Sequence, residues 1–400
     1  MNSAYIIDGI RTPIGNFGGS LSSVRTDDLA AIVLRELMKR NLSVDAKEIT
    51  DVILGCANQA GEDNRNVARM ALLLAGLPVS VSGETVNRLC ASGLSASINA
   101  ARQIMVGDAD VIIAGGVENM TRGPWVISKT STAYGRDAQM YDSSFGWRFV
   151  NPKMKEMYGT DSMGETAENL TQLKPISRED QDAFACRSQM KAAAAKKKGR
   201  FAIEIIPVEI QNKKTTTLFE QDEFMKPETT SEILGKLKPA FKKDGSVTAG
   251  NSAGLNDGAA AILLASESGI KKSGLKPLAK ILSSAAVGVE PRIMGIGPVE
   301  ASNRALAKAG LTMADMNIIE LNEAFAAQCL ACIRSWDLKD DDARINPNGG
   351  AIALGHPLGM SGARILLSAT IELHEQQKRY ALVTMCVGVG QGFAVVIEKV

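Results

Sequence analysis

The order of structural elements predicted from the sequence is repeated once along the chain. Each half contains a helix, a turn and a short strand, and later a glycine-containing turn, a helix and a buried strand. The corresponding segments are 29–38 and 302–309 for the first helix, 52–55 and 318–321 for the short strand, 90–93 and 359–362 for the turn, and 111–116 and 380–385 for the buried strand. Strands that alternate with helices predict an α/β fold. We therefore expect two similar halves whose turn loops face each other across one cleft.

The composition is that of a large globular chain without a charge bias. The 400 residues are 45% hydrophobic, which is enough for two or three domains. Lys plus Arg (45) nearly equal Asp plus Glu (44), so the overall charge favours neither nucleic acid nor a membrane surface as a partner. No run reaches the roughly 18–20 apolar residues of a membrane span. The first residues, 1–8, hold an acid and no apolar signal core. Six scattered cysteines form no disulfide framework, so we expect a cytoplasmic protein.

The amino-acid composition of the sequence changes in the middle of the chain. Between about 119 and 248, aromatic residues, methionine and proline become more frequent, and a helix is predicted over 177–198, with Ser177 and Asp180 as its cap. After this region the α/β pattern returns. We therefore predict a first half made of 1–118 and 249–272, an inserted domain over 119–248, and a second half over 273–400.

Cys90 stands at a sharp entry into a predicted helix. The small residues Ala91, Ser92 and Gly93 follow it, and an alanine-rich run with helical spacing continues to Ile104. Free N–H groups and the dipole at a helix N-terminus favour a thiolate, so we expect a reactive sulfur here. The alternative is a buried structural cysteine, because free cysteine is among the most buried residue types.

The second half contains three further side chains that could take part in catalysis. Asn322 follows a predicted strand directly, in Asn-Glu-Ala-Phe. His356 lies in the glycine-rich stretch 349–362, and Cys386 ends a strand before the closely spaced glycines of 386–392. Two thiols and one imidazole on corresponding loops of two halves suggest acyl transfer: one cysteine as a nucleophile activated by histidine, and the other as a general acid and base. Free N–H groups of the glycine turns can hold a developing oxyanion.

The other histidine and the other cysteines are assigned to structure. His374 lies on a polar helix face and is expected at the surface. Cys329 and Cys332 form a lone C-x-x-C without a second pair, so we expect core residues and no metal site. Cys56 and Cys186 lack a glycine-rich context and are also expected to be structural.

Four stretches, taken together, resemble the motifs of the thiolases. They are the Cys90 stretch 86–95, the Asn322 stretch 322–325, Gly-His-Pro-Leu-Gly-Met-Ser-Gly-Ala-Arg over 355–364, and Cys-Val-Gly-Val-Gly-Gln-Gly over 386–392. The resemblance covers essentially the whole chain, including the insertion, which resembles the thiolase loop domain. It implies two similar βαβαβαββ halves in a layered α-β-α-β-α core.

The resemblance also implies roles for single residues. Cys90 is expected to take the acyl group, and His356 to act as the base that activates it. Cys386 is expected to add or remove the proton on the α-carbon of the acyl-CoA. Asn322 is expected to hold a water that forms one oxyanion hole with His356, and the backbone N–H groups of Cys90 and Gly388 are expected to form the other.

Coenzyme A is expected as a substrate, between the inserted domain and the core, and no tightly bound cofactor is implied. Met163, Lys226, Ser252 and Met294 match positions that line the coenzyme A tunnel in thiolases. Two positions depart from the usual pattern: Ser252-Ala253 reverses the more common Ala-Ser, and Ser162 stands where some acetoacetyl-CoA thiolases carry histidine. The family implies a homodimer or homotetramer, with acyl-CoA and CoA as its small-molecule partners.

Within the thiolases, the chain resembles the group that cleaves 3-oxoadipyl-CoA to succinyl-CoA and acetyl-CoA. The resemblance rests on the stretches 55–69, 146–152 and 386–392. The acyl chain of this substrate ends in a carboxylate, for which Arg148 is the candidate cation; local pairing within the insertion is the other interpretation of Arg148. An acetoacetyl-CoA or fatty-acid 3-ketoacyl-CoA thiolase, a ketosynthase-like condensing enzyme and a non-catalytic lipid or CoA carrier are the alternatives.

Overall fold

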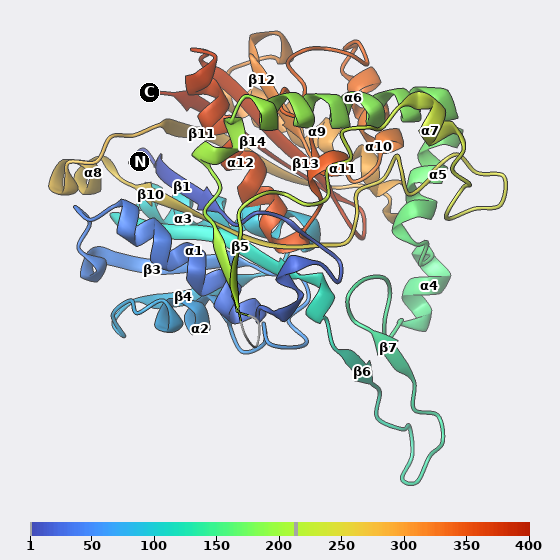
Figure 1. Cartoon of the computed structure of the whole chain (residues 1–400), viewed down its shortest axis with the longest axis horizontal. Helices are drawn as coiled ribbons and strands as arrows, with labels where there is room; N and C mark the ends of the chain where they lie inside the picture. Colours follow the sequence, from blue (N-terminus) through green and yellow to red (C-terminus); the bar gives the residue numbers. More distant parts are fainter. Residues whose placement is uncertain (1, 212–214) are drawn as a thin grey trace.

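Two sets of strands with the same pairing pattern meet at β1 and β11 (Figure 1). The structure is a computed structural model that describes residues 2–211 and 215–400. The strands follow one another in the order β12-β13-β14-β11-β1-β10-β5-β3-β4, and β2 also pairs with β10. Their bounds are β1 Tyr5–Arg11, β2 Gly15–Asn16, β3 Ile49–Gly55, β4 Ser82–Val86, β5 Val111–Asn119, β10 Asn256–Ala265, β11 Ala279–Gly288, β12 Ile318–Leu321, β13 Tyr380–Val387 and β14 Gln391–Lys399.

The pairing confirms the repeat that the sequence predicts. In the first half, β3 runs parallel to β4 and β5, and the order continues with antiparallel pairing through β10 to β1. In the second half, β12 runs parallel to β13, and antiparallel pairing continues through β14 to β11. Where β4 lies beside β3, the second half has a single parallel bridge from Ile319 to Ile345. Among the described strands, β1 and β11 join the sheets of the two halves through the pairs Tyr5–Lys280 and Ile6–Ala279.

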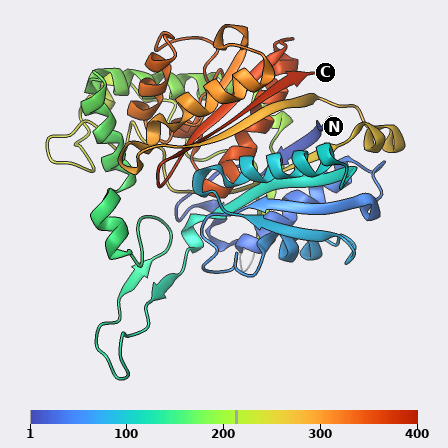
Figure 2. The ribbon, with the colours of Figure 1, turned by 180° about the vertical axis from the view of Figure 1, so that it is seen from behind.

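The helices divide the core into layers. Helices α1 (Thr26–Arg40) and α2 (Val67–Leu74) share an apolar cluster with the outer face of the first-half strands. Helices α9 (Gly297–Ala309) and α10 (Ala326–Ser335) do the same for the second half. Helices α3 (Ser92–Val106) and α12 (Leu358–Glu375) share a third cluster with the inner faces of both sets of strands. The result is the α-β-α-β-α layering that the thiolase resemblance implies, visible in both ribbon views (Figures 1 and 2).

The N-terminal turns of the two central helices touch. A Cβ on Gly93 of α3 would come within 2.5 Å of the Gly359 carbonyl oxygen of α12. A Cβ on Gly362 would likewise overlap the backbone of Leu94. Only glycine allows such a close approach. These glycines bring together the helix starts that follow Cys90 and His356.

The insertion carries its own short elements. Its helices are α4 Pro152–Tyr158, α5 Met163–Leu173, α6 Arg178–Lys197 and α7 Ser231–Gly235, and its hairpins pair β6 Trp125–Ile127 with β7 Met140–Asp142 and β8 Val208–Gln211 with β9 Thr216–Phe219. The β6–β7 hairpin extends away from the rest of the chain (Figures 1 and 2). Helix α6 begins with the predicted capping box of Ser177 and Asp180. In the described residues, no helix is both long and apolar enough to cross a membrane.

A buried ion network ties the insertion to the first strand. Arg11, at the end of β1, pairs with Glu204 and Asp222 at 2.7 Å each, and all three side chains are fully buried. Arg200 pairs with Glu204 at 3.0 Å and with Glu372 of α12 at 2.9 Å. Because these charges compensate one another inside the protein, the insertion cannot move from β1 and α12 without exposing or unpairing them. The domain boundaries given above remain a proposal.

Candidate active site

Cys90 lies at the strained turn between β4 and α3. It is the middle residue of the 3-10 helix η3 (Leu89–Ala91), and α3 begins directly after it. Leu89 has a φ of 45°, in the left-handed region that is unfavourable for a branched side chain. The sharp entry into a helix is therefore present as expected. Only 9% of the Cys90 surface is exposed.

The helix start does not make Cys90 a thiolate at rest. Burial raises the pKa of the Cys90 thiol to about 11, although hydrogen bonds from the backbone N–H groups of Gly388 and of Cys90 itself act in the opposite direction. The nearby charge of Glu118 makes a smaller contribution to the same rise in pKa. The favourable effect of the helix start is smaller than the loss of hydration around the sulfur. Cys90 therefore rests as a thiol and needs a base.

The second cysteine reaches Cys90 from the other half of the fold. Cys386 is the penultimate residue of β13 and is fully buried. A tight turn follows it, with Val389 at φ 61° and Gly390 at φ 80°, and this turn points the Gly388 N–H at the Cys90 sulfur. Burial raises the pKa of Cys386 well above its ordinary value, and the nearness of Cys90 raises it further. Both sulfurs are therefore protonated at neutral pH.

His356 lies between the short helix α11 (Ala351–Leu354) and α12. Its backbone N–H donates to Asn256 at 2.9 Å, and its Nδ1 is 2.6 Å from the Ser361 hydroxyl. That hydroxyl also donates to the Pro357 carbonyl oxygen at 2.8 Å. Since the carbonyl can only accept, Ser361 uses its one hydrogen there, and Nδ1 must be the donor in the contact with Ser361. The Nε2 atom then carries the free lone pair.

The free nitrogen of His356 faces Asn322. The two side chains approach to 3.4 Å between Nδ2 of Asn322 and Nε2 of His356. Burial, together with the neighbouring Arg364 guanidinium, lowers the pKa of His356 to about 3, so the ring is neutral at physiological pH. The Oδ1 atom of Asn322 is buried and has no hydrogen-bond partner among the described residues. A neutral base and an amide oxygen that can accept a hydrogen bond therefore lie side by side.

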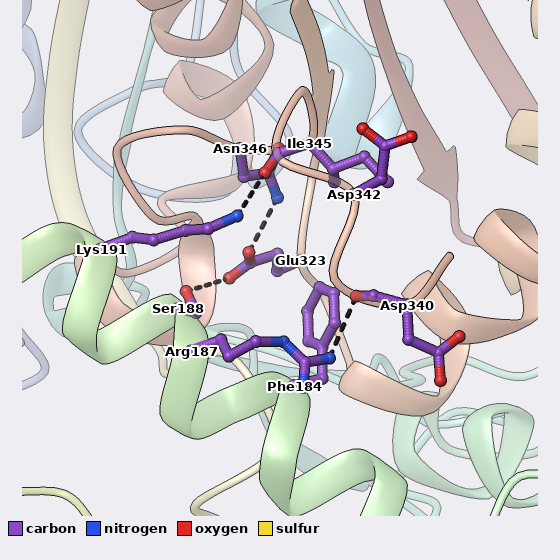
Figure 3. Close-up of a pocket in the computed structure, with 9 residues that line it drawn as sticks. All are labelled: Phe184, Arg187, Ser188, Lys191, Glu323, Asp340, Asp342, Ile345 and Asn346. Carbon is purple, nitrogen blue, oxygen red and sulfur yellow. Dashed lines mark hydrogen bonds between the residues drawn. The ribbon is translucent and has the colours of Figure 1, made fainter. Parts of the chain in front are cut away.

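Glu323 holds the Asn322 loop in place. Its carboxylate accepts hydrogen bonds from Ser188 of α6 at 2.6 Å and from Asn346 at 2.8 Å (Figure 3). It also accepts from the backbone N–H of Ile352 at 3.2 Å. The small polar pocket drawn there lies beside this carboxylate, and none of the predicted site residues lines it. The insertion thus contacts the loop that carries Asn322. Sequence reasoning missed this residue, although a carboxylate directly after a buried strand is a signal for it.

The predicted coenzyme A residues are only partly brought together. Met163 and Met294 share a small apolar cluster with Cys386. Ser252 bridges to Phe325 of the same cluster, but its hydroxyl donates to the Thr248 carbonyl oxygen at 2.7 Å. Ser162, which replaces a histidine of some relatives, is the N-cap of α5.

Lys226 contacts Gln189 and Phe224. Its backbone N–H donates to Gln189 at 2.9 Å, and its ammonium lies 5.8 Å from the centre of the Phe224 ring. Its contact with coenzyme A stays a prediction.

The remaining cysteines and His374 are placed as follows. Cys329 and Cys332 are fully buried on α10, as expected for core residues. The prediction for His374 was wrong: the side chain is partly buried, and its Nε2 lies 2.8 Å from the Leu278 carbonyl oxygen. The polar helix face that the sequence predicts does not indicate that the Leu278 carbonyl oxygen, next to the start of β11, lies within hydrogen-bond distance of His374.

Cys56, Asp63 and Glu118 are the one group in the described chain whose ligand atoms converge within 4.8 Å, as a metal site would require. Both carboxylates already accept backbone N–H groups: Asp63 from Gln59 and Gly61, and Glu118 from Ala57 and Asn58 of the same loop and from Gly359. Such bonds compensate the charges without a cation. We therefore read this cluster as an organiser of loops.

Comparisons with known proteins agree with this geometry. The family model described as "Thiolase, N-terminal domain" matches residues 4–268, and the one described as "Thiolase, C-terminal domain" matches residues 275–399. The chain belongs to the thiolase family. As a thiolase it is an acyltransferase, and the Cys90, Asn322, His356 and Cys386 stretches are where its sequence carries the family motifs.

Individual thiolases match over the whole chain. The "3-oxoadipyl-CoA/3-oxo-5,6-dehydrosuberyl-CoA thiolase" of Escherichia coli strain K12 is 61% identical, and the "Beta-ketoadipyl-CoA thiolase" of Pseudomonas putida is 56% identical, each with 100% of both chains covered. The crystal structure of human mitochondrial 3-ketoacyl-CoA thiolase superposes with a TM-score of 0.92 at 40% identity, covering 100% of this chain and 99% of that chain. The similarity is thus greater to the two relatives named for dicarboxylic substrates.

Proposed function

We propose that this thiolase cleaves 3-oxoadipyl-CoA with CoA to succinyl-CoA and acetyl-CoA, by way of an acyl thioester on Cys90. One observation carries the chemistry: the backbone N–H of Gly388, in the second half, lies close enough to the Cys90 sulfur of the first half to lower its pKa, and Cys386 lies nearby. Nucleophile, acid and an oxyanion donor thus meet where the two halves meet.

In the first step, Nε2 of His356 takes the proton of the Cys90 thiol as the sulfur attacks the 3-oxo carbon. The new imidazolium N–H and a water held by Oδ1 of Asn322 stabilise the oxyanion. The bond between the second and third carbons then breaks, and its electron pair stays on the acetyl-CoA carbanion. The Cys386 thiol protonates that carbon, so acetyl-CoA leaves and succinyl remains on Cys90.

In the second step, the Cys386 thiolate takes the proton of an incoming CoA thiol. The CoA sulfur attacks the Cys90 thioester, and the oxyanion lies against the N–H groups of Cys90 and Gly388. The intermediate collapses to succinyl-CoA, and His356 returns its proton to the departing Cys90 sulfur. Both cysteines end the cycle as thiols, which matches their raised pKa values.

The preference for a dicarboxylic substrate is supported by a contact between two of the stretches that resemble the 3-oxoadipyl-CoA group. Arg148 of the stretch 146–152 donates to the carbonyl oxygens of Ser143 at 3.3 Å and Asn58 at 3.5 Å, and Asn58 belongs to the stretch 55–69. No carboxylate of the described residues lies within ion-pair distance of Arg148. Asn58 in turn neighbours Ala57, whose carbonyl accepts from Asn87 in the Cys90 loop at 3.0 Å. A guanidinium without a carboxylate partner among the described residues therefore lies on a loop that contacts the Cys90 loop, and a terminal carboxylate of the substrate could pair with it.

A substrate panel tests both parts of the proposal. With 3-oxoadipyl-CoA, acetoacetyl-CoA and a medium-chain 3-ketoacyl-CoA, acetyl-CoA release should be fastest from 3-oxoadipyl-CoA. Arg148→Ala should lower kcat/KM for 3-oxoadipyl-CoA by about tenfold to a hundredfold, the range expected for losing a charge-assisted hydrogen bond, and should spare acetoacetyl-CoA. Arg136→Ala, an exposed arginine of the same insertion, is the control. Equal losses on both substrates would remove Arg148 from the proposal.

Three further features belong to this proposal. Coenzyme A binds as a substrate with Met163, Met294, Ser252 and Lys226 along its path, and nothing is tightly bound. The protein works in the cytoplasm. It is a homodimer or homotetramer, and the exposed apolar side chains of the β6–β7 hairpin support such contacts: Trp125 is 72%, Ile127 66% and Met140 62% exposed. Light scattering on the purified chain measures the number of subunits.

A further inference from the structure

Glu118 receives three backbone hydrogen bonds from two distant parts of the chain. It lies near the end of β5 and is 2% exposed. Its Oε2 accepts from the N–H of Ala57 at 2.9 Å and of Gly359 at 2.8 Å, and its Oε1 accepts from the N–H of Asn58 at 3.0 Å. One carboxylate thus joins a loop of the first half to the first turn of α12 in the second half.

The charge of Glu118 is balanced by the backbone alone. No lysine or arginine of the described residues lies within ion-pair distance of it. Gly359 belongs to the first turn of α12, where the helix dipole and unpaired N–H groups favour an anion. Burial raises the pKa of Glu118 to about 7, and the three N–H groups act against that shift. Above that pH the carboxylate is ionised and holds all three N–H groups as charge-assisted bonds.

Both segments that Glu118 joins lead to the reacting groups. Gly359 follows closely on His356, and its Cα is enclosed so tightly that a Cβ would meet Glu118 and the Gly55 carbonyl oxygen. Asn58 carries the carbonyl that accepts from Arg148. Ala57 carries the carbonyl that accepts from Asn87 in the Cys90 loop. The carboxylate therefore lies at the junction of the base, the nucleophile loop and the loop that we place at the acyl end.

We infer that Glu118 is a positioning residue for the acyl transfer: its carboxylate holds the first turn of α12, and with it His356, against the loop that lies between Cys90 and Arg148. The inference rests on the proposed function for the identity of the reaction, but the bonds that define it do not. Misplacing the base by about 1 Å is expected to lower the rate by about a hundredfold without a matching loss of substrate binding.

Glu118→Gln is the sharpest test, because both carboxylate oxygens accept N–H groups. Glutamine keeps the size but replaces one oxygen with an NH2 group, so either orientation sets a donor against at least one backbone N–H. Glu118→Asp keeps the charge but shortens the side chain, so that it cannot reach all three N–H groups. Asp63→Asn is the matched control: Asp63 is 5% exposed and belongs to the same cluster, but it accepts only from Cys56, Gln59 and Gly61 of its own loop.

Two measurements distinguish a positioning role of Glu118 from a purely structural one. The first is kcat and KM at pH 8.5 for whichever 3-oxoacyl-CoA the wild type cleaves best. The second is the pH dependence of Cys90 alkylation by iodoacetamide, which needs no substrate. The titratable groups around Glu118 are Cys56 and Asp63 on the loop after β3 and Cys90 on η3. Because the charge of Glu118 raises the pKa of Cys90, removing it should move the alkylation midpoint to lower pH.

We expect Glu118→Gln to lose about tenfold to a hundredfold in kcat, with KM within about threefold, while Cys90 becomes easier to alkylate. Glu118→Asp should lose kcat but keep the alkylation midpoint, and Asp63→Asn should keep both. A folded Glu118→Gln with wild-type kcat, or equal losses in Glu118→Gln and Asp63→Asn, would overturn the inference. If Glu118→Gln does not fold, wild-type kcat in Glu118→Asp would overturn it. If the wild type cleaves no 3-oxoacyl-CoA, the proposed function fails. In that case the alkylation experiment still tests the inference, and an unshifted midpoint in Glu118→Gln would overturn it.

Discussion

Ser361→Ala should weaken His356 as a base. The hydroxyl of Ser361 lies 2.6 Å from Nδ1 of His356 and donates to the Pro357 carbonyl oxygen, so it directs the ring proton to Nδ1. Ser361 is fully buried and His356 is 6% exposed. Without the hydroxyl, Nδ1–H is a buried donor without a partner, and the ring gains the tautomer in which Nε2 is protonated and cannot take the Cys90 proton.

The size of the effect follows from the unpaired donor. A buried donor that loses its partner costs about 1–3 kcal/mol. Since about 1.4 kcal/mol is tenfold in rate, kcat should fall by roughly fivefold to a hundredfold. The loss should appear in the acylation step, measured by single-turnover release of acetyl-CoA, and KM should change little because Ser361 contacts no substrate in the proposed mechanism.

Ser97→Ala is the matched control for Ser361→Ala. Ser97 is also fully buried, and it donates to the carbonyl oxygen one turn earlier in α3, that of Gly93, at 2.9 Å, just as Ser361 does in α12. Both variants lose such a helical hydrogen bond, but only one loses a contact to histidine. Equal acylation rates in Ser361→Ala and Ser97→Ala would refute the assignment of the tautomer.

Three further outcomes follow from the structure. Cys386→Ala should abolish acetyl-CoA release, while Cys90 can still be alkylated. Exchange of the α-carbon hydrogens of acetyl-CoA in D2O should also disappear, and this exchange is the measurement. His356 has a pKa of about 3 in the folded state and about 6.5 unfolded, so the unfolded chain binds the proton first, and stability should fall as pH drops from 6.5 towards 3. Compared with His356→Asn, the wild type should lose about 2 kcal/mol more between pH 7 and pH 5 in urea unfolding. Arg11→Met should lower the free energy of unfolding by about 3–5 kcal/mol, because it leaves the buried Asp222 carboxylate without an ion-pair partner and Glu204 with Arg200 alone; a loss below 1 kcal/mol would contradict that interpretation.

Much of the fold could be predicted because strands and helices carry their own periodic signals. The buried run 318–321 is β12 with the predicted bounds, and the predicted strand over 380–385 is the greater part of β13. The helix predicted over 302–309 begins earlier, at Gly297, because Pro298 fits the first turn of a helix but reads as a breaker in the sequence. Strand β4 (Ser82–Val86) gave no signal, because an edge strand that is partly exposed does not need apolar residues.

The sequence singles out the proposed reacting side chains, but not the groups that orient them. Cys90, His356 and Cys386 stand out by residue type and by the glycines near them, and Asn322 by its place directly after a predicted strand. Ser361 lies inside a stretch that the sequence singles out, yet only its distance to His356 shows what it does. Glu118 and Glu323 each follow or end a buried strand, and such carboxylates reveal a role only when the backbone N–H groups that reach them are known.

The resting state of Cys90 shows why magnitudes, and not only motifs, decide such questions. A helix start stabilises an anion by about 0.3–1 kcal/mol, and by about 2 kcal/mol in favourable partly buried sites. Burial moves the Cys90 pKa from its ordinary 9.0 to about 11, against the helix start and two backbone N–H groups, which corresponds to about 3 kcal/mol in favour of the thiol. His356, with a pKa of about 3, cannot hold the proton before the oxyanion forms beside it. Proton transfer and attack must therefore be coupled, so the solvent isotope effect on acylation should exceed that of a preformed thiolate, and an effect of unity would show that the thiolate exists before substrate binds.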